Sequence, residues 1–244
     1  MPHRFLDGPN GRVAYEKTDG EGPCVVWLGG FRSDMTGTKA THLEAWAQNR
    51  GRAFLRFDYS GHGASDGEFR DGAISIWLDD AAAAIDALTD GPIILVGSSM
   101  GGWIAGLLTR TLSDRLAGLV LIAPAPDFTE TLMWPNLGPG ARRSIEEDGA
   151  CALPSLYDQE PTIITKKLIE DGRRNLLLGA PLAYDGPVRI LQGMADPEVP
   201  WRHAVQFAET ITSDDVRITL TKSGDHRLST PDDLQRLTDT LDAL

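Results

Sequence analysis

The chain carries a serine at a position where serine can act as a nucleophile. The run Gly97-Ser98-Ser99-Met100-Gly101 fits the pattern G-x-S-x-G, which places its central serine on a strained turn between a strand and a helix. An ordinary Gly/Ser turn would also fit these five residues. However, residues 93–96 are apolar and β-branched like a buried strand, and residues 100–112 have helical apolar spacing. We therefore predict that Ser99 is a nucleophile and that Ser98 is structural.

The two glycines of this motif and the helix after it shape the same turn. A side chain at Gly97 or Gly101 would collide with the neighbouring strand or helix, and the turn needs unusual backbone angles. The amides at the helix N-terminus point at the serine, where they can stabilise developing negative charge. We predict that the backbone amide of Met100 is one donor of an oxyanion hole.

A second oxyanion donor is expected from an earlier loop. Residues 24–28 form an apolar strand that ends in Gly29-Gly30-Phe31-Arg32-Ser33. The loop after the third strand of a hydrolase sheet supplies one oxyanion-hole amide, and we assign it to Phe31. The alternative for the two glycines is an ordinary turn.

An acid and a base follow the serine in the chain order Ser…Asp…His that this motif requires. Asp196 lies just past the strand predicted at residues 188–193, and Glu198 competes with it two residues further on. His226 lies between the last predicted strand, 216–220, and the C-terminal helix. Because each residue follows a strand of one parallel sheet, all three can meet above one edge of that sheet.

This set of residues can perform acyl transfer. A serine hydroxyl is a weak nucleophile until a base takes its proton. His226 is the predicted base and later protonates the leaving group, while Asp196 fixes the tautomer and stabilises the imidazolium. The chemistry needs neither a metal nor an organic cofactor. Esters and thioesters pass through similar tetrahedral intermediates, so substrate choice is expected to lie elsewhere in the chain.

Other residues of catalytic types are predicted to be structural. His62 lies in a polar, glycine-rich loop that precedes the nucleophile, whereas the base comes last in this chain order. His203 is expected on the surface of a helix, and Asp225 in a turn. The two cysteines, Cys24 and Cys151, suggest neither a disulfide framework nor a metal site, and Cys24 is expected to be buried.

Buried strands alternate with amphipathic helices along the chain. This alternation predicts an α/β fold, here an α/β-hydrolase sheet that is mostly parallel with helices on both faces, in a single domain over residues 1–244. Residues 3–7 and 12–18 are expected to form a short antiparallel pair. The further expected strands are 53–57 and 116–123, and the expected helices are 38–49, 74–88, 200–212 and 231–244.

The stretch between the strands at 116–123 and 188–193 is far longer than a crossover needs. We interpret residues 124–186 as a cap inserted over the strand ends, with helical stretches near 138–149 and 161–177. Its apolar residues either line a substrate pocket or pack the cap onto the body. The predicted substrate contacts are Trp103 after the nucleophile motif and Phe128, Met133 and Trp134 in the cap, with Leu132 and Leu137 as further candidates.

The composition narrows the classes of function. The chain has 244 residues and a formal net charge of −12, and an acidic surface repels nucleic acid and anionic membranes. No run approaches the roughly 18 apolar residues of a membrane span, and the N-terminus has no apolar signal region. We therefore expect a soluble, cytoplasmic protein whose partner is a small ester or thioester, with an acylated protein as a second class of partner.

Several longer runs resemble one family. They are residues 33–40 (SDMTGTKA), residues 56–61 (RFDYSG), residues 91–103 (GPIILVGSSMGGW), Gly193-Met194 with Val199-Pro200-Trp201, and Asp225-His226-Arg227. In these runs the chain resembles the α/β-hydrolase-domain acyl-protein thioesterases of mitochondria, palmitoyl thioesterases also described as acyl-glucuronide esterases. The resemblance is that of a bacterial relative and implies a nucleophile, acid and base at Ser99, Asp196 and His226. Small esters and other acyl thioesters are equally open as substrates.

Three classes of function follow from these residues. The first is a serine hydrolase of carboxylic esters or acyl thioesters, because every catalytic position is filled. The second is another reaction on the same fold, such as carbon–carbon bond hydrolysis or perhydrolysis. The third is a non-catalytic module that binds a small ligand in the pocket.

Overall fold

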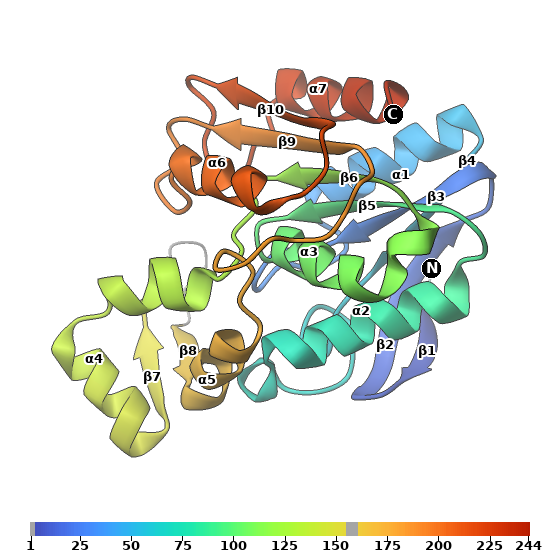
Figure 1. Cartoon of the computed structure of the whole chain (residues 1–244). Helices are drawn as coiled ribbons and strands as arrows, with labels where there is room; N and C mark the ends of the chain where they lie inside the picture. Colours follow the sequence, from blue (N-terminus) through green and yellow to red (C-terminus); the bar gives the residue numbers. More distant parts are fainter. Residues whose placement is uncertain (1–2, 155–160) are drawn as a thin grey trace.

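A single sheet of eight strands runs through the computed structural model, which describes residues 3–154 and 161–244 (Figure 1). The strand order is β1-β2-β4-β3-β5-β6-β9-β10. β1 and β2 are antiparallel, β2 is antiparallel to β4, and the other neighbours are parallel. The strands are β1 (Arg4–Gly8), β2 (Gly11–Thr18), β3 (Glu21–Leu28), β4 (Arg52–Phe57), β5 (Ile93–Ser98), β6 (Leu116–Ile122), β9 (Val188–Gly193) and β10 (Val216–Thr221).

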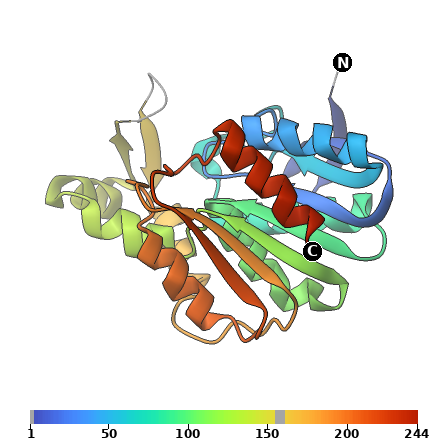
Figure 2. The same cartoon turned by 90° about the horizontal axis from the view of Figure 1, so that it is seen from above.

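Helices cover both faces of this sheet. They are α1 (Thr38–Arg50), α2 (Ile74–Leu88), α3 (Met100–Leu112), α6 (Trp201–Thr210) and α7 (Pro231–Asp242). α1 and α7 pack together on one face, and α2, α3 and α6 lie on the other (Figure 2). In β5, Ile94 and Val96 belong to the core under α1 and α7, whereas Ile93 and Leu95 belong to the opposite core. Burial on both faces explains why this strand is apolar without alternation.

The segment between β6 and β9 lies at the side of the sheet where the parallel strands end (Figure 1). Its elements are α4 (Pro139–Arg143), β7 (Ala150–Leu153), β8 (Thr162–Thr165) and α5 (Lys166–Arg174), with π-helical turns at Thr129–Met133 and Ser144–Asp148. Single 3-10 turns lie at Phe69–Asp71, Ser113–Arg115 and Trp134–Asn136. This segment corresponds to the cap inferred from the sequence, of which residues 155–160 lie outside the described residues.

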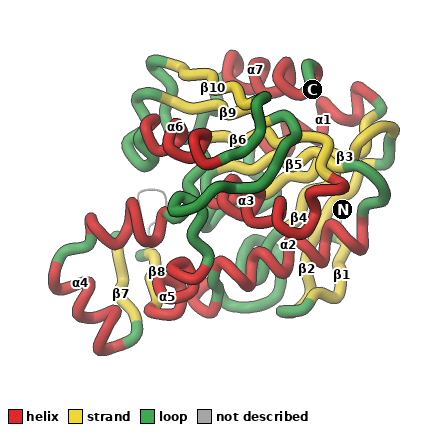
Figure 3. Tube along the Cα trace, in the orientation of Figure 1, coloured by secondary structure: helices red, strands yellow, loops and turns green. Residues whose placement is uncertain are grey.

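The prediction that this segment is helical over 161–177 was wrong at its start. Strands β7 and β8 pair antiparallel, as Figure 3 shows among the neighbouring helices. Residues 162–165 are Thr-Ile-Ile-Thr, and β-branched side chains favour a strand over a helix. α5 begins only after Thr165, whose hydroxyl accepts the amide of Leu168 as an N-cap.

Two buried carboxylates hold this segment in place. Asp171 on α5 accepts the amide and the hydroxyl of Ser75 at the start of α2, at 2.8 and 2.7 Å. Asp127, five residues after β6, accepts the amides of Leu177 and Leu178, at 2.8 and 2.9 Å. The first contact fastens the segment to α2, and the second ties the beginning of the segment to its later part.

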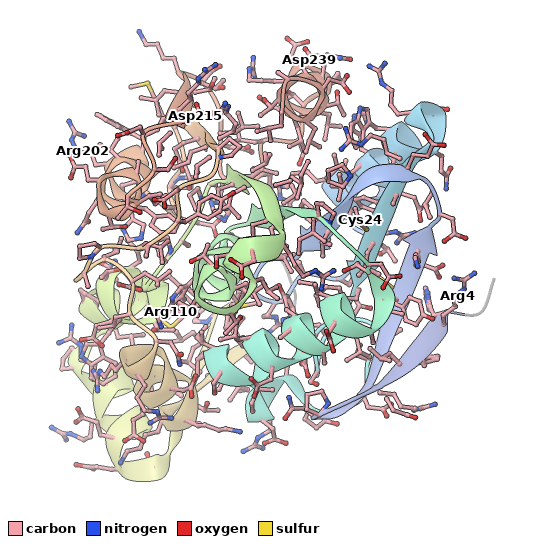
Figure 4. The ribbon with its side chains drawn as sticks, turned by 45° about the vertical axis from the view of Figure 1, so that its right-hand side comes forward. Arg4, Cys24, Arg110, Arg202, Asp215 and Asp239 are labelled. Atoms are coloured by element: carbon pink, nitrogen blue, oxygen red, sulfur yellow. The ribbon has the colours of Figure 1, made fainter. Side chains whose placement is uncertain are left out.

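The two cysteines of the chain, Cys24 and Cys151, do not form a disulfide. Cys24 is buried on β3, as predicted, and its label lies within the outline of the protein in Figure 4, whereas Arg202 and Asp239 lie at the periphery. Both cysteines are free.

Across the described ranges, no helix is long and apolar enough to cross a membrane. The same residues contain no group of three His, Cys, Asp or Glu side chains able to hold a metal ion.

Candidate active site

Ser99 stands in a strained turn directly after β5. Its φ angle is 54°, in the left-handed region that residues other than glycine rarely adopt, at a cost of about 1–3 kcal/mol. The turn is fixed on both sides. The Ser99 amide donates to the carbonyl of Ile122 at 2.9 Å, and its carbonyl accepts the amides of Gly102 and Ala125 at 2.9 and 3.1 Å.

The two glycines of the motif permit this close packing. A Cβ at Gly97 would lie 2.3 Å from the carbonyl oxygen of Gly101, and a Cβ at Gly101 would lie 2.0 Å from that of Leu28. Both distances are far below van der Waals contact. β5, α3 and β3 can therefore approach one another only with glycine at both positions, as the sequence predicted.

Ser99, His226 and Asp196 form one continuous chain of hydrogen bonds. The Nε2 atom of His226 lies 3.1 Å from the Oγ atom of Ser99, and its Nδ1 atom lies 2.7 Å from Oδ2 of Asp196. A carboxylate only accepts, so Nδ1 carries the proton and Nε2 is free to accept from the serine hydroxyl. The three residues follow β5, β9 and β10, whose carboxyl ends meet at one edge of the sheet (Figure 1).

Asp196 is held as a carboxylate by its surroundings. Its other oxygen, Oδ1, accepts the amides of Glu198 and Val199 at 2.8 and 2.9 Å. Burial acts to raise the pKa of Asp196, but the hydrogen bond from His226 and the two amides outweigh it and leave the pKa below its usual value. Glu198, the competing acid, lies 3.9 Å from Nε2 rather than beside Nδ1. The geometry therefore favours Asp196 over Glu198 as the partner of the imidazole.

Gln192 is a residue of this site that the sequence analysis missed. Its side chain is fully buried at the end of β9. Its amide nitrogen lies 3.2 Å from Oδ2 of Asp196 and 3.1 and 3.0 Å from the carbonyls of Val199 and Gly193. A glutamine among the apolar residues of a buried strand was a signal for it, since a buried amide needs partners.

The two predicted oxyanion donors belong to segments that adjoin the serine. Met100 is the first residue of α3. A Cβ at Gly30 would lie 3.5 Å from the Cβ of Ser99, which shows how closely the loop that contains Phe31 approaches the nucleophile. This loop is a four-residue turn in which the amide of Ser33 donates to the carbonyl of Gly30 at 3.0 Å.

A cavity of about 540 Å³ opens above this group. Its floor contains Ser99, His226 and Phe31. The inserted segment supplies an apolar wall of Phe128, Leu132, Met133, Leu153, Pro154 and Ile164, and charged residues at its rim are Arg32, Lys39, Glu198 and Arg227. The cavity thus joins an apolar compartment to the half-buried serine.

Two of the four predicted substrate contacts lie in this cavity and two do not. Phe128 and Met133 line it. Trp103 is fully buried behind Phe128, with its ring centroid 5.6 Å from that of Phe128 and its Nε1–H donating to the carbonyl of Asn175. Trp134 is outside the lining and packs under the guanidinium groups of two arginines. The prediction was wrong for both tryptophans. Trp103 faces the core from α3, and Trp134 points away from the cavity that Met133 lines because adjacent residues of a helical turn face different directions.

His62 and His203, the two histidines for which the sequence predicts structural roles, are both buried and outside the cavity. His62 has the structural placement expected of it. The prediction that His203 lies on the surface was wrong, because this residue is on the inner face of α6 with Ala204 and Phe207. Its Nε2 atom lies 2.8 Å from the carbonyl of Pro126, and burial lowers the pKa of His203.

Lys39 connects α1 to the loop after β10. Its ammonium nitrogen donates to the carbonyl of Arg227 and lies 3.5 Å from the hydroxyl of Ser229. Burial lowers the pKa of Lys39 to about 8, although the carboxylates of Asp225 and Asp233 oppose this shift. The folded protein therefore favours the uncharged form of this amine more strongly than the unfolded chain does.

The Gln192→Glu variant tests the buried amide beside Asp196. A second carboxyl group here has a raised pKa because its negative charge and that of Asp196 repel each other. The folded protein therefore favours this group in its protonated form. We expect the variant to approach wild-type stability below about pH 4 and to lose on the order of 1–3 kcal/mol as the pH rises through the folded pKa. Urea unfolding of both proteins across this pH range measures the difference. Gln192→Leu, the control, should be destabilised by an amount that does not vary with pH. A constant difference for Gln192→Glu would contradict this placement.

A second prediction concerns the amine of Lys39. Its pKa is about 8 in the folded protein against an ordinary value of 10.5, so the unfolded chain binds more protons between these two values and stability rises with pH there. Relative to Lys39→Met, the wild type should gain on the order of 1–3 kcal/mol of unfolding free energy across this interval. Urea unfolding at a series of pH values provides the measurement. If the two proteins differ by the same amount at every pH, the amine is not desolvated as described.

Comparisons with known proteins identify the family of this chain. The profile of the family described as serine aminopeptidase, S33 matches residues 24–146. The mitochondrial palmitoyl-protein thioesterase ABHD10 of Bos taurus is 37% identical over 98% of this chain and 79% of its own length. The solved structure of mouse α/β-hydrolase domain-containing protein 10 has a TM-score of 0.91 at 34% identity, covering 100% of this chain and 98% of its own. A solved structure from Agrobacterium vitis S4 has a TM-score of 0.95 at 45% identity, covering 99% and 98%. The predicted fold class is confirmed, and the chain belongs to the α/β-hydrolase family, in the group related to ABHD10.

Proposed function

We propose that this protein is a serine hydrolase that cleaves acyl esters or acyl thioesters through an acyl-enzyme. The observation that carries the proposal is the unbroken hydrogen-bond chain from Ser99 through His226 to Asp196. The serine lies on the floor of a cavity with an apolar wall. Such a chain converts a weak hydroxyl nucleophile into an effective one.

The reaction follows from the positions of the atoms. Ser99 Oγ attacks the acyl carbon while its proton passes to Nε2 of His226, and the resulting imidazolium is stabilised by the carboxylate of Asp196. The amides of Phe31 and Met100 donate hydrogen bonds to the acyl oxygen and stabilise the negative charge that develops on it. The imidazolium then protonates the departing alcohol or thiol, which leaves Ser99 acylated. A water molecule, deprotonated by the same imidazole, attacks the acyl group and restores the free serine.

The acyl chain is the part of the substrate that the cavity supports best. The apolar wall contains Phe128, Leu132, Met133 and Ile164, and burial of each methylene contributes about 0.8 kcal/mol. The bovine relative described above is a palmitoyl-protein thioesterase by name, which supports a long acyl group and a thiol leaving group. A thiol, with a pKa near 8.5, leaves more readily than an alcohol. Both a small-molecule thioester and an acylated protein are consistent with this chemistry.

Hydrolysis of a chain-length series tests the proposal. Acyl groups of about two to sixteen carbons are offered as p-nitrophenyl esters and as thioesters. If each added methylene enters the apolar compartment, kcat/KM should rise about fourfold per methylene until the cavity is filled. Ser99→Ala should lose nearly all activity while its melting temperature stays close to that of the wild type.

Other outcomes would distinguish the alternative functions. Turnover that survives in Ser99→Ala would contradict the proposed nucleophile. A wild-type protein that neither hydrolyses the series nor reacts with a fluorophosphonate probe would instead be a ligand-binding module. Labelling by the probe without ester or thioester turnover would favour another reaction of the same residues, such as carbon–carbon bond hydrolysis or perhydrolysis.

A further inference from the structure

His62 has an unused chemical capacity close to the candidate active site. It lies in the loop after β4 and is only 4% exposed. The rings of Tyr59, Phe69 and Trp77 surround it, with centroid distances of 5.7, 5.2 and 5.2 Å. No step of the proposed reaction uses this imidazole.

The two ring nitrogens of His62 have different partners. Nδ1 lies 3.2 Å from the carbonyl of Ser60, which can only accept, so Nδ1 carries the proton. Nε2 lies 3.2 Å from the backbone nitrogen of Arg32 and accepts its N–H. Burial lowers the pKa of His62 to about 4, which keeps Nε2 available as an acceptor at neutral pH. Only one tautomer of the neutral ring satisfies both contacts.

The Arg32 amide, which donates a hydrogen bond to His62, belongs to the loop of the predicted oxyanion donor. Residues 30–33 form a turn closed by the hydrogen bond from Ser33 to Gly30, and Arg32 occupies its third position with a φ angle of 60°. A positive φ at the third position is the mark of a type II turn, where glycine is normally preferred. Arginine is disfavoured there by about 1–2 kcal/mol. Something outside the turn must therefore hold this conformation.

The peptide group between Phe31 and Arg32 is the part of the turn that can reverse. Type I and type II turns differ in the orientation of this central peptide. The Nε2 atom of His62 can accept a hydrogen bond from the Arg32 amide only when this peptide group has the observed orientation. A reversal would change ψ of Phe31 and φ of Arg32, and the loop of the predicted oxyanion donor would lose its hydrogen bond to His62.

A second contact links the same two loops. Asp58, at the end of β4, accepts the amide of Met35 at 2.6 Å and that of Ala64 at 2.9 Å. The loop after β4 thus holds the loop after β3 at two points, near Arg32 and at Met35. Of the two, only the contact from His62 reaches the turn that lies against the nucleophile.

We propose that His62 is a positioning residue that holds the turn over residues 30–33 in its type II form beside the nucleophile, and so keeps the loop of the predicted oxyanion donor, Phe31, in place. The proposal rests on the proposed function, since it assigns a role within that reaction. His62 itself touches neither substrate nor Ser99.

The first comparison uses His62→Leu and His62→Gln, with steady-state kinetics on a p-nitrophenyl ester. Loss of one oxyanion donor lowers kcat by about 100- to 1000-fold in other hydrolases, so a displaced donor should lower it by about 10- to 100-fold in His62→Leu. KM should stay within about threefold, because the donor acts mainly in the transition state. His62→Gln, whose amide oxygen can accept the Arg32 N–H, should keep kcat within about threefold of the wild type.

The second comparison tests the backbone conformation directly. Glycine adopts a positive φ without strain and alanine does not, while both remove the arginine side chain. In the His62→Leu background, Arg32→Gly should therefore recover kcat by at least about fivefold over Arg32→Ala. The single variants Arg32→Gly and Arg32→Ala, in which His62 is intact, measure the effect of losing the arginine side chain on kcat. Melting temperatures identify any variant that has unfolded.

Several results would overturn the proposal. It fails if folded His62→Leu keeps wild-type kcat, if His62→Gln loses as much kcat as His62→Leu, or if Arg32→Gly and Arg32→Ala give equal kcat in the His62→Leu background. These failures leave the proposed function intact as long as the wild type shows turnover that depends on Ser99. If the wild type shows no such turnover, the proposed function itself fails.

Discussion

The close contact of three backbones around Ser99 is the constraint on which the candidate site depends. β5, α3 and β3 approach so closely at Gly97 and Gly101 that no side chain fits at either position. This contact forces the turn between β5 and α3 into a positive φ at Ser99 and exposes the hydroxyl at the edge of the sheet. It also directs the first turn of α3 toward the same point. The cost of the strained turn is met by the large apolar cores on both faces of the sheet.

Buried hydrogen bonds then fix the groups that the sheet brings together. On one side, Gln192 and the amides after β9 leave Asp196 a single orientation, which in turn sets the tautomer of His226. On the other side, His62 accepts the Arg32 amide. Each of these contacts involves a polar group that would be unpaired in the interior without it. The reacting groups are thereby held in place before a substrate arrives, which is the condition for efficient electrostatic stabilisation.

The sequence predicted the parts of the site that depend on local pattern and chain order. The order of Ser99, Asp196 and His226 and their places after strands follow from alternation of apolar runs and loops. His203 and Trp134 were misjudged because the direction of a side chain on a short helix depends on what the helix packs against. The strands β7 and β8 were missed because they pair with each other apart from the main sheet, although the β-branched run of β8 was a local signal for a strand. The role of Gln192 likewise depends on residues of a different segment.

Direct detection of the acyl-enzyme is the measurement that tests the central claim most closely. The protein is mixed with a p-nitrophenyl acyl ester, quenched in acid during the first turnovers, digested and analysed by mass spectrometry. The account predicts one acyl group per chain, located on the peptide that contains Ser99 and absent from Ser99→Ala. Turnover without any acylated peptide would contradict this mechanism. A Ser99→Ala variant that stays active and carries the acyl group on another residue would contradict it as well.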